Sequence, residues 1–177
     1  MSPAPAPAEA ARRAVLLGVG NILLTDEGVG VRAVERFGER YALPEGVEIL
    51  DGGTSAMEML DELENLDLLV VVDCVRVGKA PASVVVLTDD EVPAFFRQRL
   101  SPHQVGLSDV FATMLLTGRA PRAIVVIGVQ PVAIELSMSL TPEVEAVMPE
   151  VFDAIHGTFG AHGYEVTPRR RDDKAAA

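Results

Sequence analysis

Cysteine is almost absent from this chain, which has one, Cys74, among 177 residues. A single cysteine cannot form an intrachain disulfide, and a chain of this length buries roughly 70% of its unfolded surface without such cross-links. Because free thiols persist in reducing compartments, we expect a cytoplasmic protein. No histidine lies near Cys74 in the sequence, so we interpret it as a small buried apolar residue and not as a nucleophile.

Basic residues are scarce. The chain has 15 lysines and arginines against 26 aspartates and glutamates, which gives a formal net charge of −11. Proteins that bind nucleic acid neutralise phosphates with clustered basic side chains, so we expect no nucleic-acid partner. An acidic field instead favours cations and basic partners.

Apolar runs long enough to cross a membrane are also missing, since a spanning helix needs about 20 consecutive apolar residues. The segment 14–24 follows Arg12 and Arg13 and so resembles the start of a signal peptide. No small-residue cleavage motif follows it, and the run leads into Asp26 and Glu27. We therefore expect a buried strand at its start and no membrane association.

Several catalytic motifs are absent as well. The chain has neither the H-E-x-x-H of zinc proteases nor the G-x-S-x-G of serine hydrolases. The turn at Gly18 and Gly20 begins like a dinucleotide-binding fingerprint, but Leu23 stands where that fingerprint requires a third glycine. The phosphate interpretation is therefore weak, and the acid pair Asp26 and Glu27 favours a cation.

What the chain does contain is an alternation of strand and helix patterns. Short apolar runs predict strands at 15–19, 47–50, 68–72, 83–87 and 123–129. Apolar residues at helical spacing predict helices around 34–41, 55–65, 93–100, 107–114 and 142–159. This order predicts an α/β protein, a three-layer α/β/α sandwich with a mostly parallel twisted sheet of about five strands. The short connection before 83–87 predicts that this strand has an antiparallel neighbour.

Two helix starts carry local signals. Ser55 and Glu58 have the spacing of a capping box, in which each side chain bonds to the other residue's backbone N–H. Thr141 followed by Pro142 is a favourable start for the last helix, because proline suits the first helical position. We expect both helices to begin at these residues.

The ends of the chain differ in composition from its middle. Residues 1–12 are rich in proline and alanine, and residues 169–177 form a short charged segment. Neither segment has many side chains that a core could bury, so both are predicted to be disordered. Residues 13–168 contain no repeat and no flexible linker, which predicts a single domain.

Three side chains of metal-ligand type fall at strand ends or in loops: Glu27, Asp73 and His103. Two carboxylates and one imidazole could hold a divalent ion with open positions left for other ligands. Each residue also has a simpler interpretation. Glu27 could offset the positive end of a helix, Asp73 could accept hydrogen bonds in a turn, and His103, in the segment before a helix, could have no role.

Asp51 follows the second predicted strand and precedes a pair of glycines. It could bind a ribose, although the missing third glycine argues against this, or act as a general base near a substrate peptide. The remaining histidines, His156 and His162, lie in and just after the last predicted helix, and we expect both at the surface.

Four motifs together resemble the hydrogenase maturation endopeptidases. They are G-V-G-N-I-L-L-T-D-E-G-V-G at 18–30, E-I-L-D-G-G-T at 48–54, V-V-D-C at 71–74 and S-P-H-Q-V-G-L-S-D-V at 101–110. They occur in the family's order and at compatible spacings, and the resemblance extends over residues 14–155. Enzymes of this family remove a C-terminal extension from the large subunit precursor of a nickel-iron hydrogenase after nickel insertion.

The resemblance implies roles for particular residues. The family's metal-contacting set falls on Glu27, Asp73 and His103, with Asp51 to Thr54 as a wall of the cleft. It implies that nickel comes from the precursor, that the nickel-loaded precursor is the partner, and that no organic cofactor is needed. A monomer is the default expectation.

Two other functions are alternatives to the protease. A maturation chaperone would bind the nickel-loaded precursor through the same three side chains without cutting it. A nucleotide-binding regulator would use the turn at Gly18 and Gly20, and the leucine at position 23 argues against it.

Overall fold

The computed structural model describes residues 12–88, 91–92 and 102–169, without the side chains of residues 56 and 102–106. The helix predicted over 93–100 lies outside these residues, as do most of the two predicted tails. At the borders of the tails, Arg12 donates a hydrogen bond to the His162 carbonyl (2.7 Å) and Arg169 donates to the Gly38 carbonyl (2.9 Å). Disorder beyond these two residues stays a prediction.

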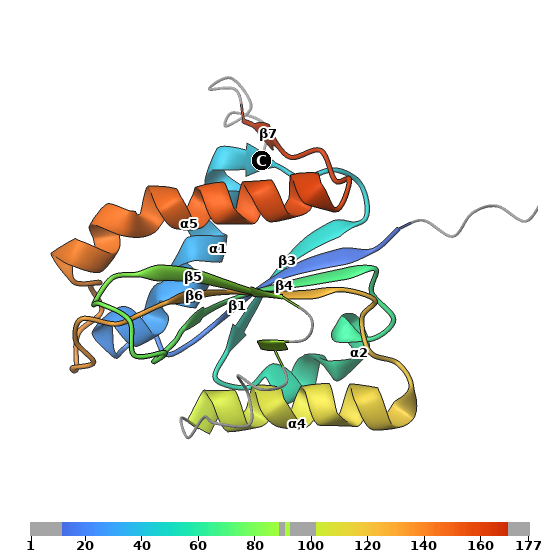
Figure 1. Cartoon of the computed structure of the whole chain (residues 1–177), viewed down its shortest axis with the longest axis horizontal. Coiled ribbons are helices and arrows are strands. Elements are labelled where there is room, and N and C mark those ends of the chain that lie inside the picture. The colour runs from blue at the N-terminus through green and yellow to red at the C-terminus, as the bar shows by residue number, and fades with distance from the viewer. Residues whose placement is uncertain (1–11, 89–90, 93–101, 170–177) are drawn as a thin grey trace, which may run out of the picture.

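A five-stranded sheet forms the centre of the protein (Figure 1). Its strands, in the order β3-β1-β4-β6-β5, are β3 (Val47–Gly53), β1 (Ala14–Val19), β4 (Leu68–Cys74), β6 (Ile124–Val129) and β5 (Val84–Thr88). The first four are mutually parallel, and β5 is antiparallel to β6. The predicted α/β sandwich with a mostly parallel sheet is therefore confirmed. The antiparallel neighbour of β5 is β6, and not β4, which precedes β5 in the chain.

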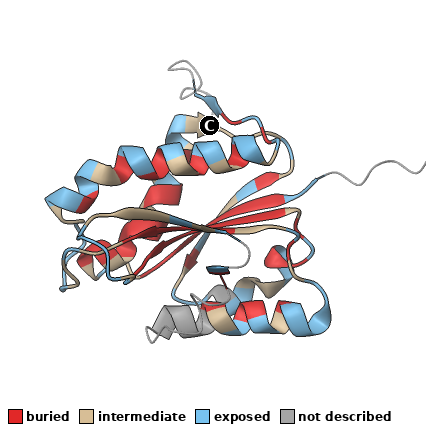
Figure 2. Ribbon diagram, viewed as in Figure 1, coloured by how far each residue is buried: buried red, intermediate tan, exposed pale blue. Residues whose placement is uncertain are grey.

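Helices cover both faces of the sheet, as Figure 1 shows. Helices α1 (Val29–Arg40) and α5 (Pro142–Ala161) pack on one face, whereas α2 (Leu60–Leu63) and α4 (Pro102–Thr117) pack on the other. All seven residues of β4 are buried, as expected for a central strand with both faces covered. Figure 2 shows this burial along the middle of the sheet. No helix in the described part of the chain is long and apolar enough to cross a membrane.

The end of α1 differs from the prediction. Apolar spacing placed Tyr41 on this helix, but α1 ends at Arg40, and Tyr41 begins β2 (Tyr41–Ala42), which pairs with β7 (Thr167–Pro168). The Tyr41 ring still stacks on Phe37, with ring centroids 4.4 Å apart. The helical spacing therefore identified a residue that packs on the core, but not its backbone conformation.

The two predicted helix starts had different outcomes. Thr141 caps α5 as predicted, because its hydroxyl accepts a hydrogen bond from the Val144 N–H. Ser55 makes no side-chain cap, so the predicted capping box is wrong. The Glu58 N–H donates instead to the Ser55 backbone carbonyl (3.1 Å), within the 3₁₀ turn η2 (Ala56–Met59) that precedes α2.

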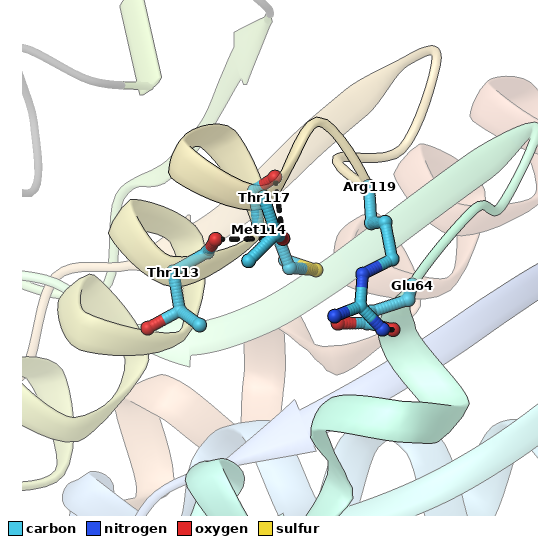
Figure 3. A network of polar contacts seen from close by, with 5 residues as sticks. All are labelled: Glu64, Thr113, Met114, Thr117 and Arg119. Atoms are coloured by element: carbon cyan, nitrogen blue, oxygen red, sulfur yellow. Dashed lines mark hydrogen bonds and ion pairs between the residues drawn. The ribbon is translucent and has the colours of Figure 1, made fainter.

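The last turn of α4 is fixed near the amino end of β4. Arg119 forms an ion pair with Glu64 (2.7 Å), and the Thr117 hydroxyl donates to the Thr113 carbonyl (2.9 Å), as Figure 3 shows. The Asn65 N–H, just before β4, donates to the Arg119 carbonyl (2.8 Å). A 16-residue helix is about 24 Å long, similar to a seven-residue strand. The first turn of α4 therefore lies near the carboxyl ends of the strands.

Candidate active site

A cleft of about 330 Å³ opens at the carboxyl ends of β1 and β3. Its walls are the segment 20–23, which follows β1, together with Asp51 and Gly53 of β3, Thr54 just after that strand, and Val31 of α1. Open α/β sheets bind their ligands at this edge. Sequence reasoning missed Asn21, which lines the cleft and whose side-chain oxygen accepts from the Leu23 N–H (3.0 Å).

Two glycines explain how the first motif forms this edge. Gly20 has a φ of +133°, and a Cβ there would lie 1.9 Å from the Glu27 carbonyl oxygen. A Cβ on Gly30 would lie 2.2 Å from the Val72 carbonyl oxygen, so α1 can approach the sheet only because this residue is glycine. In a dinucleotide fingerprint, the glycine at the position of Leu23 allows the helix to pack closely on the sheet. Here Gly30 allows this packing instead, and Leu23 is half exposed.

Asp26 and Glu27 do not form the carboxylate pair that the sequence suggested. Asp26 is fully buried, and its carboxylate accepts hydrogen bonds from the backbone N–H groups of Val132 (2.9 Å), Ala133 (3.1 Å) and Thr141 (2.8 Å) and from the Thr141 hydroxyl. Its lone pairs therefore anchor the segment 130–141, which joins β6 to α5. Only Glu27 of the pair stays a candidate ligand.

Thr25 reinforces the same anchor. Its hydroxyl donates to the Ala133 carbonyl (2.8 Å) and accepts from the Glu135 N–H (3.0 Å), and its own N–H donates to the Ser137 carbonyl (2.8 Å). The sequence gave no signal for this role, because the partners are more than 100 residues away. The segment after β1 and the segment after β6 are therefore held together as one wall.

Glu27 and Asp73 reach the sheet edge from different elements. Glu27 lies in the 3₁₀ helix η1 (Thr25–Gly28) and is partly buried, whereas Asp73 is the fully buried penultimate residue of β4. Because side chains alternate along a strand, Asp73 points to the same face as Val71, which packs in the core under α4. Glu27 is two residues before α1, so its position also agrees with a role in offsetting the positive helix end.

The pKa of the Cys74 thiol is shifted by the charged groups at this edge of the sheet. Burial raises the pKa of its thiol far above the ordinary range, the charges of Asp73, Glu27 and Asp26 raise it further, and Arg76 opposes them. The thiol is 5% exposed and stays protonated at neutral pH. Cys74 is therefore a buried residue, as predicted, and its surroundings are those of an inert thiol.

His103 is not in a loop, as the sequence suggested, but is the second residue of α4. Pro102 occupies the first helical position, where its missing N–H has no cost, so the helix begins one residue before the histidine. The His103 side chain lies outside the described part of the structure. Within that part no group of three or more His, Cys, Asp and Glu side chains could hold a metal ion. The three-ligand set therefore stays a prediction.

Asp51 lies on the other side of the sheet from Asp73. It pairs in register with Gly18, which also pairs with Val72, so Asp51 and Val72 point to the face covered by α1. The side chain is exposed in the cleft, and its Oδ1 accepts from the Gly53 N–H (2.8 Å). Asp51 thus lines this cleft, and its role in substrate binding stays a prediction.

The other two histidines lie at the far end of α5. His156 is exposed, and its Nε2 is 3.1 Å from the Val166 carbonyl oxygen. His162 is partly exposed, and its Nδ1 is 2.9 Å from the Thr158 carbonyl oxygen. Neither lines the cleft.

A cleft and grouped carboxylates at the carboxyl ends of a parallel sheet are the arrangement of an α/β enzyme. Comparison with known families specifies the class: residues 31–158 match the family model described as hydrogenase maturation protease, HycI. The chain belongs to the hydrogenase maturation protease family and is a peptidase.

Individual relatives agree with this assignment. The chain is 45% identical over 158 residues to the hydrogenase 2 maturation protease of Escherichia coli, covering 89% of this chain and 96% of that protein. It is 42% identical over 163 residues to the hydrogenase expression/formation protein HupD of Rhodobacter capsulatus, covering 91% and 78%.

A solved structure shows the same fold. The hydrogenase maturating endopeptidase HybD from Escherichia coli superposes with a TM-score of 0.86 at 45% identity, covering 89% of this chain and 98% of that one. A maturation protease from Thermococcus kodakarensis, at 24% identity and a TM-score of 0.69 over 82% of this chain and 98% of that one, shares the fold. The resemblance read from the four motifs is therefore confirmed at the level of family and fold.

Proposed function

We propose that this peptidase removes the C-terminal extension of a nickel-iron hydrogenase large subunit precursor after nickel has been inserted, and that it recognises the precursor by its nickel. The enzyme acts in the cytoplasm as a monomer and uses no organic cofactor. The observation that supports the proposal is that the buried Asp73 ends β4, that Glu27 follows β1, and that the first turn of α4, which bears His103, lies toward the same edge of the sheet.

The side chains of Glu27, Asp73 and His103 are suitable ligands for nickel. Carboxylate oxygens and an imidazole nitrogen are ligands for divalent first-row metals, and imidazole in particular suits nickel. The charges of both carboxylates raise the pKa of the Cys74 thiol, so both lie near the end of β4. In the proposed complex the nickel is part of the substrate, held by the precursor's own thiolates, and Glu27, Asp73 and His103 complete its coordination.

Docking by the metal would position the peptide for hydrolysis. Holding a reactant at a catalytic site converts a bimolecular encounter into an intramolecular one, for which effective molarities reach about 10⁵ M or more. Hydrolysis breaks one peptide bond and adds water across it, leaving a new carboxylate on the precursor and a new amino group on the released peptide. We assign Asp51, which is exposed in the cleft, as the carboxylate that accepts a proton from that water.

The test is intact-mass spectrometry of a nickel-loaded precursor and a nickel-free precursor, each incubated with this protein. We expect a C-terminal peptide to be lost from the loaded sample only. Equal cleavage of both samples would contradict recognition through nickel. An unchanged mass in both, with a stable complex formed, would contradict cleavage of this precursor and favour the chaperone interpretation.

A further inference from the structure

Four exposed apolar side chains lie on the two paired segments that follow β1 and β6, and we call them the apolar rim: Ile22, Leu23, Leu136 and Met138. Their exposed fractions are 38%, 50%, 86% and 60%. Ile22 and Leu23 also line the cleft itself, so the rim is continuous with it. The other two side chains come from the segment that joins β6 to α5.

Backbone pairing brings the two halves of the rim together. Leu24 and Ser137 form an isolated parallel bridge, in which the Ser137 N–H donates to the Leu23 carbonyl (3.0 Å). Leu23 and Leu136 each come one residue before this pair, so they lie side by side on segments spaced as neighbouring strands, roughly 5 Å apart. The backbone pairing therefore places the exposed residues of the two segments next to one another. Figure 1 shows the β6–α5 segment beside the start of α1.

Hydrogen bonds hold the backbone of the apolar rim in place. The buried carboxylate of Asp26 accepts three backbone N–H groups of the segment 130–141, and the Arg32 guanidinium donates to the backbone carbonyls of Ile22 and Met138. These contacts fix the backbone while the apolar side chains stay exposed to solvent. A fixed surface loses little conformational entropy when a partner binds, which favours affinity.

We propose that the apolar rim binds an apolar stretch of the substrate polypeptide next to the bond that is cut. This inference rests on the proposed function, because it assigns the rim to the same substrate. Ile22 and Leu23 of the rim line the cleft, and all four rim side chains are apolar, so the rim fits an apolar segment of the peptide that the cleft holds. Covering these exposed apolar groups with such a segment removes them from water, which favours binding.

The chain offers a matched pair of leucines for the test. Leu136 in the rim is 86% exposed, and Leu116 near the end of α4 is 88% exposed. We would measure KM and kcat for cleavage of the nickel-loaded precursor by wild type, Leu136→Asp and Leu116→Asp. Leu136→Asp should raise KM at least tenfold, because burying one leucine changes an affinity by about 10- to 100-fold. Leu116→Asp should leave KM within about twofold.

Two further measurements keep the test decisive. Leu136→Met, which preserves an apolar side chain, should keep the wild-type KM, and all three variants should melt with the wild type because the substituted positions are exposed. A KM for Leu136→Asp equal to that of Leu116→Asp would overturn the rim while leaving the proposed function intact. Self-association of wild type that Leu136→Asp abolishes without a change in KM would overturn it in favour of a second copy of this chain.

If wild type leaves the precursor uncut, the proposed cleavage fails, and the rim is tested by the Kd of the uncut nickel-loaded precursor. A Kd at least tenfold weaker for Leu136→Asp than for Leu116→Asp would support the rim as a docking surface. Equal values for the two variants would overturn it.

Discussion

Replacing Asp26 with alanine removes the acceptor that anchors the segment 130–141. Its carboxylate receives three backbone N–H bonds and one hydroxyl bond, at 2.8 to 3.1 Å, and the side chain is fully buried. A hydrogen bond to a charged group contributes about 1.5–3 kcal/mol, so three backbone bonds set an upper bound of roughly 4.5–9 kcal/mol. Water can reach the freed donors, since Val132 is 39% exposed. We therefore expect Asp26→Ala to lower the free energy of unfolding by about 3–5 kcal/mol.

The assay is urea denaturation followed by circular dichroism, with the midpoint and slope fitted for each variant. In a domain of this size 1 kcal/mol shifts Tm by about 2–4 °C, so a loss of 3 kcal/mol corresponds to about 6–12 °C. Glu135→Ala, an exposed acid in the same segment, is the control and should change stability by about 0.5 kcal/mol or less. A loss below about 1 kcal/mol for Asp26→Ala would refute the anchoring role.

Three further predictions concern other parts of the chain. Glu27→Ala and His103→Ala should each abolish processing of a nickel-loaded precursor, as seen by intact mass, while keeping the circular dichroism spectrum of wild type; full processing by either variant would remove it from the ligand set. Gly30→Ala should lower the free energy of unfolding, measured in urea, by more than about 2 kcal/mol, because its Cβ would lie 2.2 Å from a β4 carbonyl oxygen. The control Gly157→Ala, on the exposed face of α5, should raise that free energy by about 0.5–1 kcal/mol. Equal effects of the two substitutions would contradict the close packing of α1. Burial and the raised pKa of Cys74 should make the native thiol unreactive to iodoacetamide at pH 8 and reactive in urea, and rapid native labelling would contradict the described burial.

The sheet was predictable because its signals are local. Each parallel strand is a short apolar run, and the runs alternate with helical spacing, so class and element order follow from the sequence alone. The pairing of β5 with β6 was not predictable, because connection length limits the orientation of a strand but does not name its neighbour. The capping box at Ser55 failed for a similar reason, since the backbone carbonyl took the N–H that the hydroxyl was expected to bind.

The site was less accessible to sequence reasoning. Asp26 and Glu27 are adjacent and chemically alike, and nothing in their neighbourhood distinguishes a structural acid from a candidate ligand. The difference comes from backbone N–H groups at 132, 133 and 141, which reach Asp26 only after the sheet has formed. The same holds for Asp51 and Asp73, because only the strand register shows that they point to opposite faces of the sheet.

That division between faces constrains how the proposed substrate can bind. Asp73 faces the layer of α4, whose first turn carries His103, whereas Asp51 and the cleft face α1. A substrate that presents its metal to Asp73 and its peptide to the cleft must therefore pass over the carboxyl ends of β1 and β4. Glu27 lies in the segment that crosses this edge, between the strand and α1. Metal recognition and peptide binding would then be separate contacts on one rigid edge, so a precursor without its metal would lose one anchor while the cleft stayed intact.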